Sequence, residues 1–141
     1  MAIDPLKNYP GYALRRASAA AMADLAERLT ALELRPTESS VLLIIDANLN
    51  VTQSEIGRML EIASANMAPL ISRLEARDLI EREPVDGRSH GLNLSTTGRA
   101  LTAKVKKAVQ AHETALLAKI PAAERAAFLS GLRALWSSED E

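Results

Sequence analysis

Two short helical patterns followed at once by a hairpin pattern, within residues 52–99, constrain the fold of this 141-residue chain most strongly. Thr52 and Glu55 have the spacing of a capping box, in which each side chain satisfies a free backbone N–H at a helix start. The apolar residues after them recur at helical spacing and predict a buried face: Ile56, Met59 and Leu60. A short helix ending near Glu61 is therefore expected, with Gly57 allowing close approach of the next helix.

A second helical pattern follows, for which we expect Ser64 as the N-cap and an end near Arg77. Its apolar residues have the i, i+3, i+4, i+7 spacing of a packed face: Met67, Leu70, Ile71 and Leu74. Pro69 falls inside this pattern, where it removes a backbone hydrogen bond. We therefore expect either a bent first turn or a helix that starts later, near Asn66.

A hairpin pattern completes the segment. Residues 79–82 favour a strand, Asp86-Gly87 supplies a turn, and residues 90–94 alternate apolar and polar side chains as a returning strand. Ser95 then caps another helix. Helix, turn, helix and hairpin in this order are typical of a winged helix-turn-helix, which presents its second helix to the major groove of DNA.

The exposed side of the second helix carries the best candidates for DNA contact. Asn66 can pair with adenine through two hydrogen bonds, although a solvated polar residue is the alternative. Arg73 can hold a phosphate, whereas Arg77 can simply pair with a nearby acid. Arg88 at the hairpin tip can enter a narrow minor groove, or else pair with Asp86. The candidate DNA-binding residues are Thr52, Gln53, Ser54, Ser64, Asn66, Arg73 and Arg88.

Three segments together resemble the MarR (multiple antibiotic resistance regulator) family: TQSEIGRMLEI, LISRLEARDLIER and PVDGRSHGLNLSTTGRAL. The matching positions are Leu74, Glu75, Leu79, Asp86, Arg88, Leu94, Ser95 and Gly98. The opening YALRRAS also resembles the first helix of many members, so the similarity covers nearly the whole chain. The chain departs from the family pattern at Pro69, at Asp78 (where the family has glycine), and in a wing that carries one Arg.

The flanking residues are helical in pattern and carry more apolar surface than a small winged helix can bury. One stripe lies before residue 35, another follows residue 100, and a last helix is expected to start at Pro121. Burying these stripes against a second copy gives a two-fold dimer, which the family resemblance also implies. We therefore predict a mainly α fold with a small β-hairpin in one domain, residues 1–141. Dimerisation helices at about 1–35 and 100–141 would flank a winged helix-turn-helix at 36–99.

The resemblance further implies a small-molecule effector bound between the dimerisation helices and the winged helix. Tyr12, Arg15 and Arg16 are candidates to hold it, and so is His112, which is alone on an apolar stripe. Packing, a solvated helix face or a dimer ion pair are the alternatives for these residues. The implied effector class is a small aromatic acid, a phenol or an acyl thioester.

Composition excludes several other function classes. The chain has no cysteine and two histidines, so thiol chemistry and a metal site are not expected, and neither is a cofactor. No Gly-rich phosphate loop or Ser-His-acid grouping points to an enzyme. Without a signal-peptide core or a long apolar run, we expect a cytoplasmic protein. A winged helix that binds a protein instead of DNA remains the alternative function.

Charge is unusual for a DNA-binding chain. The formal net charge is −1, and residues 52–99 hold six Arg against seven Asp or Glu. DNA-binding domains are often basic, because neutralising phosphates releases counterions. We therefore expect weak non-specific affinity and binding that depends on two half-sites engaged together.

Overall fold

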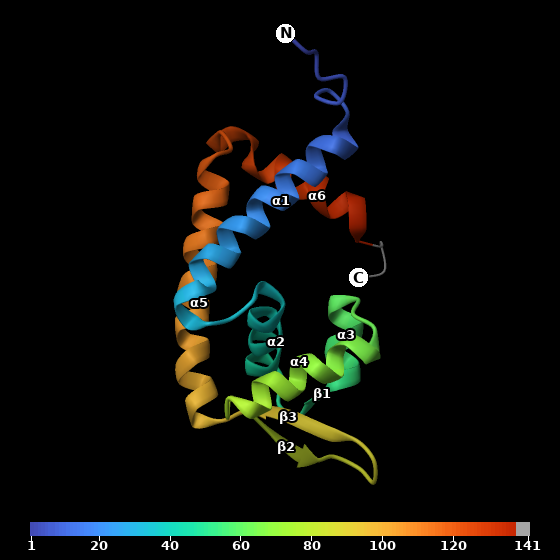
Figure 1. Cartoon of the computed structure of the whole chain (residues 1–141), viewed down its shortest axis with the longest axis vertical. Helices are drawn as coiled ribbons and strands as arrows, with labels where there is room; N and C mark the ends of the chain where they lie inside the picture. The colour runs from blue at the N-terminus through green and yellow to red at the C-terminus, as the bar shows by residue number, and fades with distance from the viewer. Residues whose placement is uncertain (138–141) are drawn as a thin grey trace.

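The computed structural model describes residues 1–137, which form a helical arm above a winged-helix part (Figure 1). The arm consists of α1 (Pro10–Leu29), α5 (Thr96–Ala118) and α6 (Arg125–Trp136). The winged-helix part consists of α2 (Pro36–Ala47), β1 (Val51–Thr52), α3 (Gln53–Leu60), α4 (Ser64–Ala76), β2 (Ile80–Pro84) and β3 (His90–Leu94). Two short 3-10 helices, η1 (Thr30–Leu32) and η2 (Ala122–Glu124), lie in the links. The predicted winged-helix fold class is confirmed.

The sheet has three antiparallel strands in the order β1-β3-β2, where the sequence predicts a two-stranded hairpin. The additional strand, β1, pairs Val51 with Leu92. A two-residue strand is too short to show the period-two alternation that identifies strands in a sequence. The predicted strands are present, and Leu92 and Leu94 are buried as expected.

One apolar core fills the winged-helix part and continues to the adjoining ends of the arm. Its fully buried members include Leu29, Val41, Leu42, Ile56, Met67, Ile71, Leu74, Leu92 and Val105. Met59 was predicted to be buried but is 57% exposed, so this prediction is wrong. In α3 the neighbouring helix packs at Gly57, where an added Cβ would lie 3.3 Å from the Met67 side chain.

Helix α4 starts one residue earlier than predicted. Ala63 is the N-cap and Ser64 the first helical residue, with no side-chain cap at this end. The helix runs through Pro69, so a start near Asn66 is also wrong. By contrast, Ser95 caps α5 as predicted, since its Oγ accepts a hydrogen bond from the Gly98 N–H at 2.9 Å.

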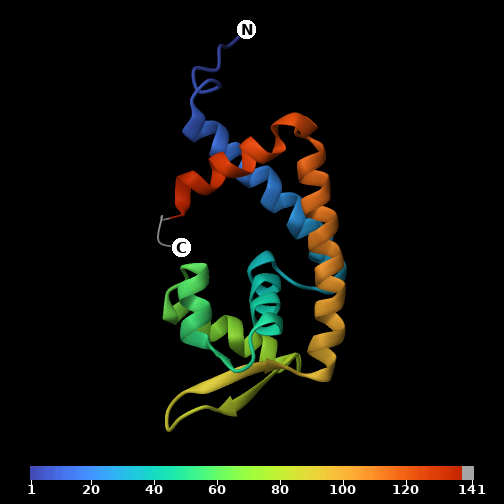
Figure 2. The ribbon, with the colours of Figure 1, turned by 180° about the vertical axis from the view of Figure 1, so that it is seen from behind.

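The arm contains a long helix, α5, which α1 packs against. Beyond a turn at the end of α5, helix α6 runs back across α1 and away from α5 (Figure 2). Pro121 precedes the short η2, so α6 begins at Arg125 and not at the proline. None of the residues of α6 is buried. Within residues 1–137, no helix is both long and apolar enough to cross a membrane.

Candidate nucleic-acid interface

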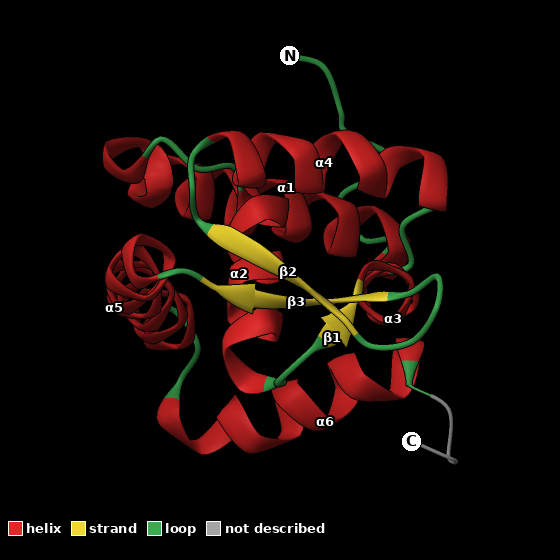
Figure 3. Cartoon of the chain, turned by 90° about the horizontal axis from the view of Figure 1, so that it is seen from below, coloured by secondary structure: helices red, strands yellow, loops and turns green. Residues whose placement is uncertain are grey.

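Helix α4 lies at the surface of the winged-helix part with the β2–β3 hairpin beside it (Figure 3). Its apolar face is buried through Met67, Leu70, Ile71 and Leu74. The other side of its first turns is exposed, and Ser64 and Asn66 are the polar residues there. This placement leaves the first turns of α4 accessible to a groove, as a recognition helix requires.

Asn66 is the exposed polar side chain best suited to read a base. Its backbone N–H donates to the Ala63 carbonyl at 2.9 Å. Within residues 1–137, its side-chain amide has no hydrogen-bond partner, so both the amide oxygen and the NH2 group are available. An adenine edge offers the complementary acceptor and donor.

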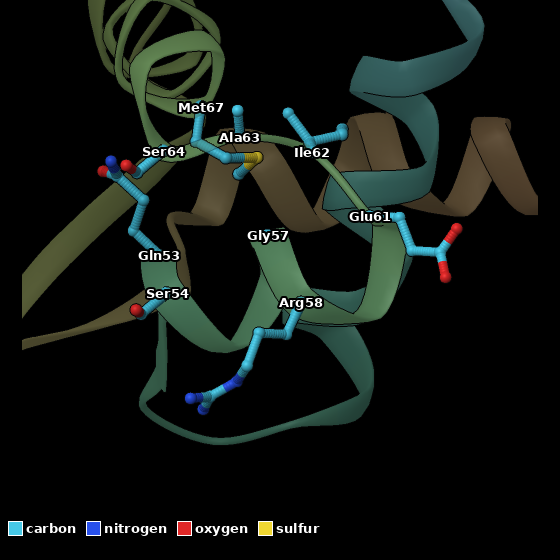
Figure 4. A pocket seen from close by; sticks show the side chains of 9 residues that line it. All are labelled: Gln53, Ser54, Gly57, Arg58, Glu61, Ile62, Ala63, Ser64 and Met67. Carbon is cyan, nitrogen blue, oxygen red and sulfur yellow. The ribbon is translucent and has the colours of Figure 1, made fainter.

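The start of α3 and the start of α4 face one another across an open hollow of about 600 Å³. Gln53 and Ser54 line it from α3, and Ser64 lines it from α4. The Gln53 side chain extends toward Ser64, whereas Arg58 projects away from the turn (Figure 4). The structure therefore brings together three of the predicted DNA-binding residues and places beside them Arg58, which was not among the predicted residues. The signal that could have found Arg58 is its place outside the apolar positions of α3.

Thr52, another candidate, belongs to the capping box of α3. Its Oγ1 accepts from the Glu55 N–H at 3.2 Å, and its own N–H donates to Glu55 Oε2 at 3.1 Å. The predicted capping box is thus present. The hydroxyl proton of Thr52 is still available to an acceptor outside the protein.

Four of the six arginines in residues 52–99 are engaged by the protein itself. Arg73 Nε lies 3.5 Å from Glu38 Oε2, and Arg82 forms a two-point pair with Glu75. Arg99 donates to the Leu94 carbonyl and to Thr96. The sequence had suggested that Arg77 pairs with a nearby acid, but within residues 1–137 it forms no such pair. Its guanidinium instead donates to the main-chain carbonyls of Glu33 and Leu32.

The remaining two guanidinium groups, those of Arg58 and Arg88, have no partner within the described part of the chain. The alternative pairing of Arg88 with Asp86 is not formed by their side chains. The Asp86 carboxylate instead accepts the backbone N–H groups of Ser89 (2.9 Å) and Arg88 (3.2 Å). These bonds, the one from Ser89 first, lower the pKa of Asp86 and fix the hairpin loop. Arg88 therefore projects from an ordered turn.

Glu75 and Arg82 connect α4 to the hairpin. Arg82 Nε lies 3.0 Å from Glu75 Oε2, and Arg82 Nη2 lies 2.8 Å from Glu75 Oε1. The hydrogen bonds lower the pKa of Glu75 and raise the pKa of Arg82. This bidentate pair links strand β2 of the wing to helix α4.

The four candidate effector residues do not form one cluster. Arg16 Nη1 donates to Tyr12 Oη at 2.8 Å, and the Arg15 guanidinium lies 5.9 Å from the centre of the Tyr12 ring. His112 is buried on α5 and contacts Asp24, which lies roughly 12 Å further along α1 than Arg16. The start of α1 and the His112 site are therefore separate places.

His112 is held inside the arm by a charged neighbour. Its Nδ1–H donates to Asp24 Oδ2 at 2.7 Å, and Arg28 Nε donates to the same oxygen at 2.8 Å. A carboxylate can only accept, so Nδ1 of His112 must carry the proton. The hydrogen bond from His112, and then that from Arg28, lower the pKa of Asp24. His112 therefore ties α5 to α1.

An apolar groove of about 650 Å³ runs between α1 and the α5–α6 end of the arm. It is lined by Leu14, Ala17, Leu116, Phe128, Leu132 and Leu135. Leu135 and Trp136 are 68% and 74% exposed. Within residues 1–137, no three His, Asp or Glu side chains are placed to hold a metal ion.

Comparisons with known proteins agree with this arrangement. Residues 32–89 match the sequence profile of the MarR family. A transcriptional regulatory protein for the hcr operon of Thauera aromatica is 26% identical over 134 residues, covering 93% of this chain and 81% of the relative.

Two solved structures of the transcriptional repressor CouR are more similar. CouR bound to a 23-mer DNA duplex is 36% identical with a TM-score of 0.87, covering 96% of this chain and 97% of CouR. CouR bound to p-coumaroyl-CoA is 33% identical with a TM-score of 0.87, covering 98% and 99%. Members of this family are regulators and not enzymes. The chain belongs to the MarR family of transcriptional regulators.

Proposed function

We propose that the protein is a homodimeric, ligand-responsive repressor that binds an inverted-repeat DNA site. The observation that carries this proposal is the exposed start of α4, with the unpaired Asn66 amide, beside a wing that presents the unpaired Arg88 guanidinium. Four further residues would contact the neighbouring DNA backbone: Thr52, Gln53, Ser54 and Ser64. Arg58 joins them as a fifth. Because DNA is the partner, we expect the protein to act in the cytoplasm.

A second copy is the occupant that best covers the apolar groove of the arm. Helix α6 buries no residue, and Leu135 and Trp136 lie exposed beside the groove. A two-fold pair of arms, drawn from about 1–35 and 100–141, would place two winged-helix parts at 36–99 on successive major grooves. The DNA-bound CouR structure supports this arrangement through its similarity along nearly the whole chain.

The proposed effector is an acyl thioester of an aromatic acid, since CouR has been solved with p-coumaroyl-CoA. Arg15 and Arg16 are exposed at the start of α1 and could hold its acidic groups, with Tyr12 against them. The Nδ1–H of His112 already donates to Asp24, so His112 is a weaker candidate for contact with the effector. If the proposal holds, adding p-coumaroyl-CoA will cause the protein to dissociate from DNA, and adding coenzyme A alone will not. An equal effect of the two compounds would contradict the effector class.

Removing the two unpaired groups separates DNA reading from a protein-interaction role. The test uses a DNA duplex that the wild-type protein selects from a random library. We expect an Asn66→Ala, Arg88→Ala double variant to bind this duplex with an affinity lower by tenfold or more, since one good base contact is worth about 1–3 kcal/mol. Fluorescence anisotropy measures the loss. Ser137→Ala, at the far end of the described chain, is the control. Unchanged binding of the double variant would favour the protein-interaction module.

A further inference from the structure

Arg77 lies at the end of α4 and reaches a different part of the molecule. It is the C-cap residue of the helix, and the next residue, Asp78, turns the chain with φ of 56°. From there its Nη1 donates to the Glu33 carbonyl at 2.7 Å and its Nη2 to the Leu32 carbonyl at 3.1 Å. Leu32 ends η1, the continuation of α1. One guanidinium thus joins the end of the recognition helix to the end of the arm.

The carbonyls that Arg77 binds are located where the arm meets the winged-helix part. Only residues 33–35 separate η1 from α2, and Glu33 itself is left-handed with φ of 54°. Carbonyls at a helix end have no partner within the helix, so a cation is favourable there. An Arg fork can serve two consecutive carbonyls at once, whereas a Lys ammonium cannot fix both directions.

A second contact comes from the same side of α4. Arg73 lies one turn before Arg77 and pairs with the buried carboxylate of Glu38, which also accepts the Arg35 N–H at 2.9 Å. The last two turns of α4 are therefore held against residues 32–38. A rotation of the arm about this junction must either carry α4 with it or break the Arg77 bonds.

We infer that Arg77 is a positioning residue that fixes the angle between the recognition helix and the arm. In a dimer built on the arms, this angle sets the separation of the two recognition helices, and this consequence rests on the proposed function. The angle itself is a property of one chain. It can therefore be tested without DNA, effector or dimer.

The absence of cysteine makes the test direct. Glu27→Cys on α1 and Ser72→Cys on α4, both exposed, place two spin labels on the parent protein. Diluting labelled chains with excess unlabelled protein leaves only the distance within one chain, which double electron–electron resonance measures. We expect a narrow distribution in the parent and a broadened, shifted one after Arg77→Gln.

A matched control is available in Arg125, whose Nε also donates to two main-chain carbonyls, those of Leu117 and Ile120, but within the arm. Arg125→Gln should leave the distribution as in the parent. Arg77→Lys, which keeps the charge, should broaden it as Gln does, and it also serves if the Gln variant fails to fold. A folded Arg77→Gln or Arg77→Lys variant with the parent's distribution would overturn the inference. DNA binding, measured separately, reports on the proposed function.

Discussion

Asp78 occupies a backbone conformation that favours glycine, with φ of 56°. The MarR family pattern has glycine at this position. Asp tolerates the left-handed region better than most residues, because its short side chain can bond locally. The Asp78 carbonyl also accepts the Ser95 hydroxyl, which links the turn between α4 and β2 to the start of α5.

Asp78→Gly should therefore stabilise the protein by about 0.5–1 kcal/mol. Relief of the left-handed strain, about 1–2 kcal/mol, is partly offset by the greater freedom of glycine in the unfolded chain. Urea denaturation measures the change. Ala68→Gly, inside α4 at an exposed position, is the control and should destabilise by about 1 kcal/mol. Equal destabilisation by the two substitutions would contradict the strain argument.

Sequence patterns predicted exposed or buried positions but not the partners of charged side chains. Asn66 and Arg88 could be identified because they lie outside the apolar pattern or at a turn. The partners of Arg77 could not, since Glu33 and Leu32 are 44 and 45 residues away in the chain. The same holds for His112, which contacts Asp24 at a separation of 88 residues. Such pairings depend on how the elements pack.

At the scale of elements, the pair between Glu75 and Arg82 couples the wing to α4. Both side chains are more than a third exposed, at 35% and 39%, so the pair is partly screened by solvent. Its hydrogen bonds lower the pKa of Glu75 in the folded protein. The pair therefore stabilises the fold above the unfolded pKa of glutamate, and this contribution is lost as the pH falls through the lowered folded value.

Glu75→Gln should cost less than about 1 kcal/mol of unfolding free energy at pH 7. The difference from the wild type should shrink toward pH 3, because the protonated fraction of Glu75 rises as the pH falls and a protonated Glu resembles Gln. Denaturant unfolding at the two pH values checks this. Glu81→Gln, an exposed acid on β2, is the control and should show little difference at either pH. A Glu75→Gln deficit that grows toward pH 3 would reverse the assigned sign.

Element boundaries followed local chemistry where that chemistry was present. The capping box at Thr52 and the cap at Ser95 marked the starts of α3 and α5 correctly. The N-cap of α4 is Ala63, whose side chain cannot cap a helix, and Ser64 is the first helical residue. The predicted N-cap, Ser64, was therefore one residue too late. Strand β1 exists because Val51 pairs with Leu92, a contact that two residues of sequence cannot indicate.

For the whole molecule, charge placement explains how a chain of net charge −1 can belong to a DNA-binding family. Four guanidinium groups are engaged within the protein: those of Arg73 and Arg82 by carboxylates, and those of Arg77 and Arg99 by main-chain carbonyls. Only Arg58 and Arg88 are left to meet phosphates or a groove from residues 52–99. The arginine contribution to DNA affinity should therefore be small for each copy.

A dimer that uses these two arginines per copy should show a salt slope of log K against log salt of roughly −4. Arg58→Ala removes two phosphate contacts per dimer and should flatten the slope by roughly two. Titrations between 50 and 200 mM salt, a range typical of such measurements, would show it. Arg99 already donates to Leu94 and Thr96, so Arg99→Gln should leave the slope unchanged. A wild-type slope near −10 would contradict this charge assignment.

The central claim, that two copies read an inverted repeat through α4 and the wing, is tested most directly by selection from a random duplex library. The proposal predicts enrichment of an inverted repeat with half-site centres about one helical turn (roughly 10 base pairs) apart, bound by two chains. Enrichment of a single half-site bound by one chain, or of no sequence at all, would contradict it.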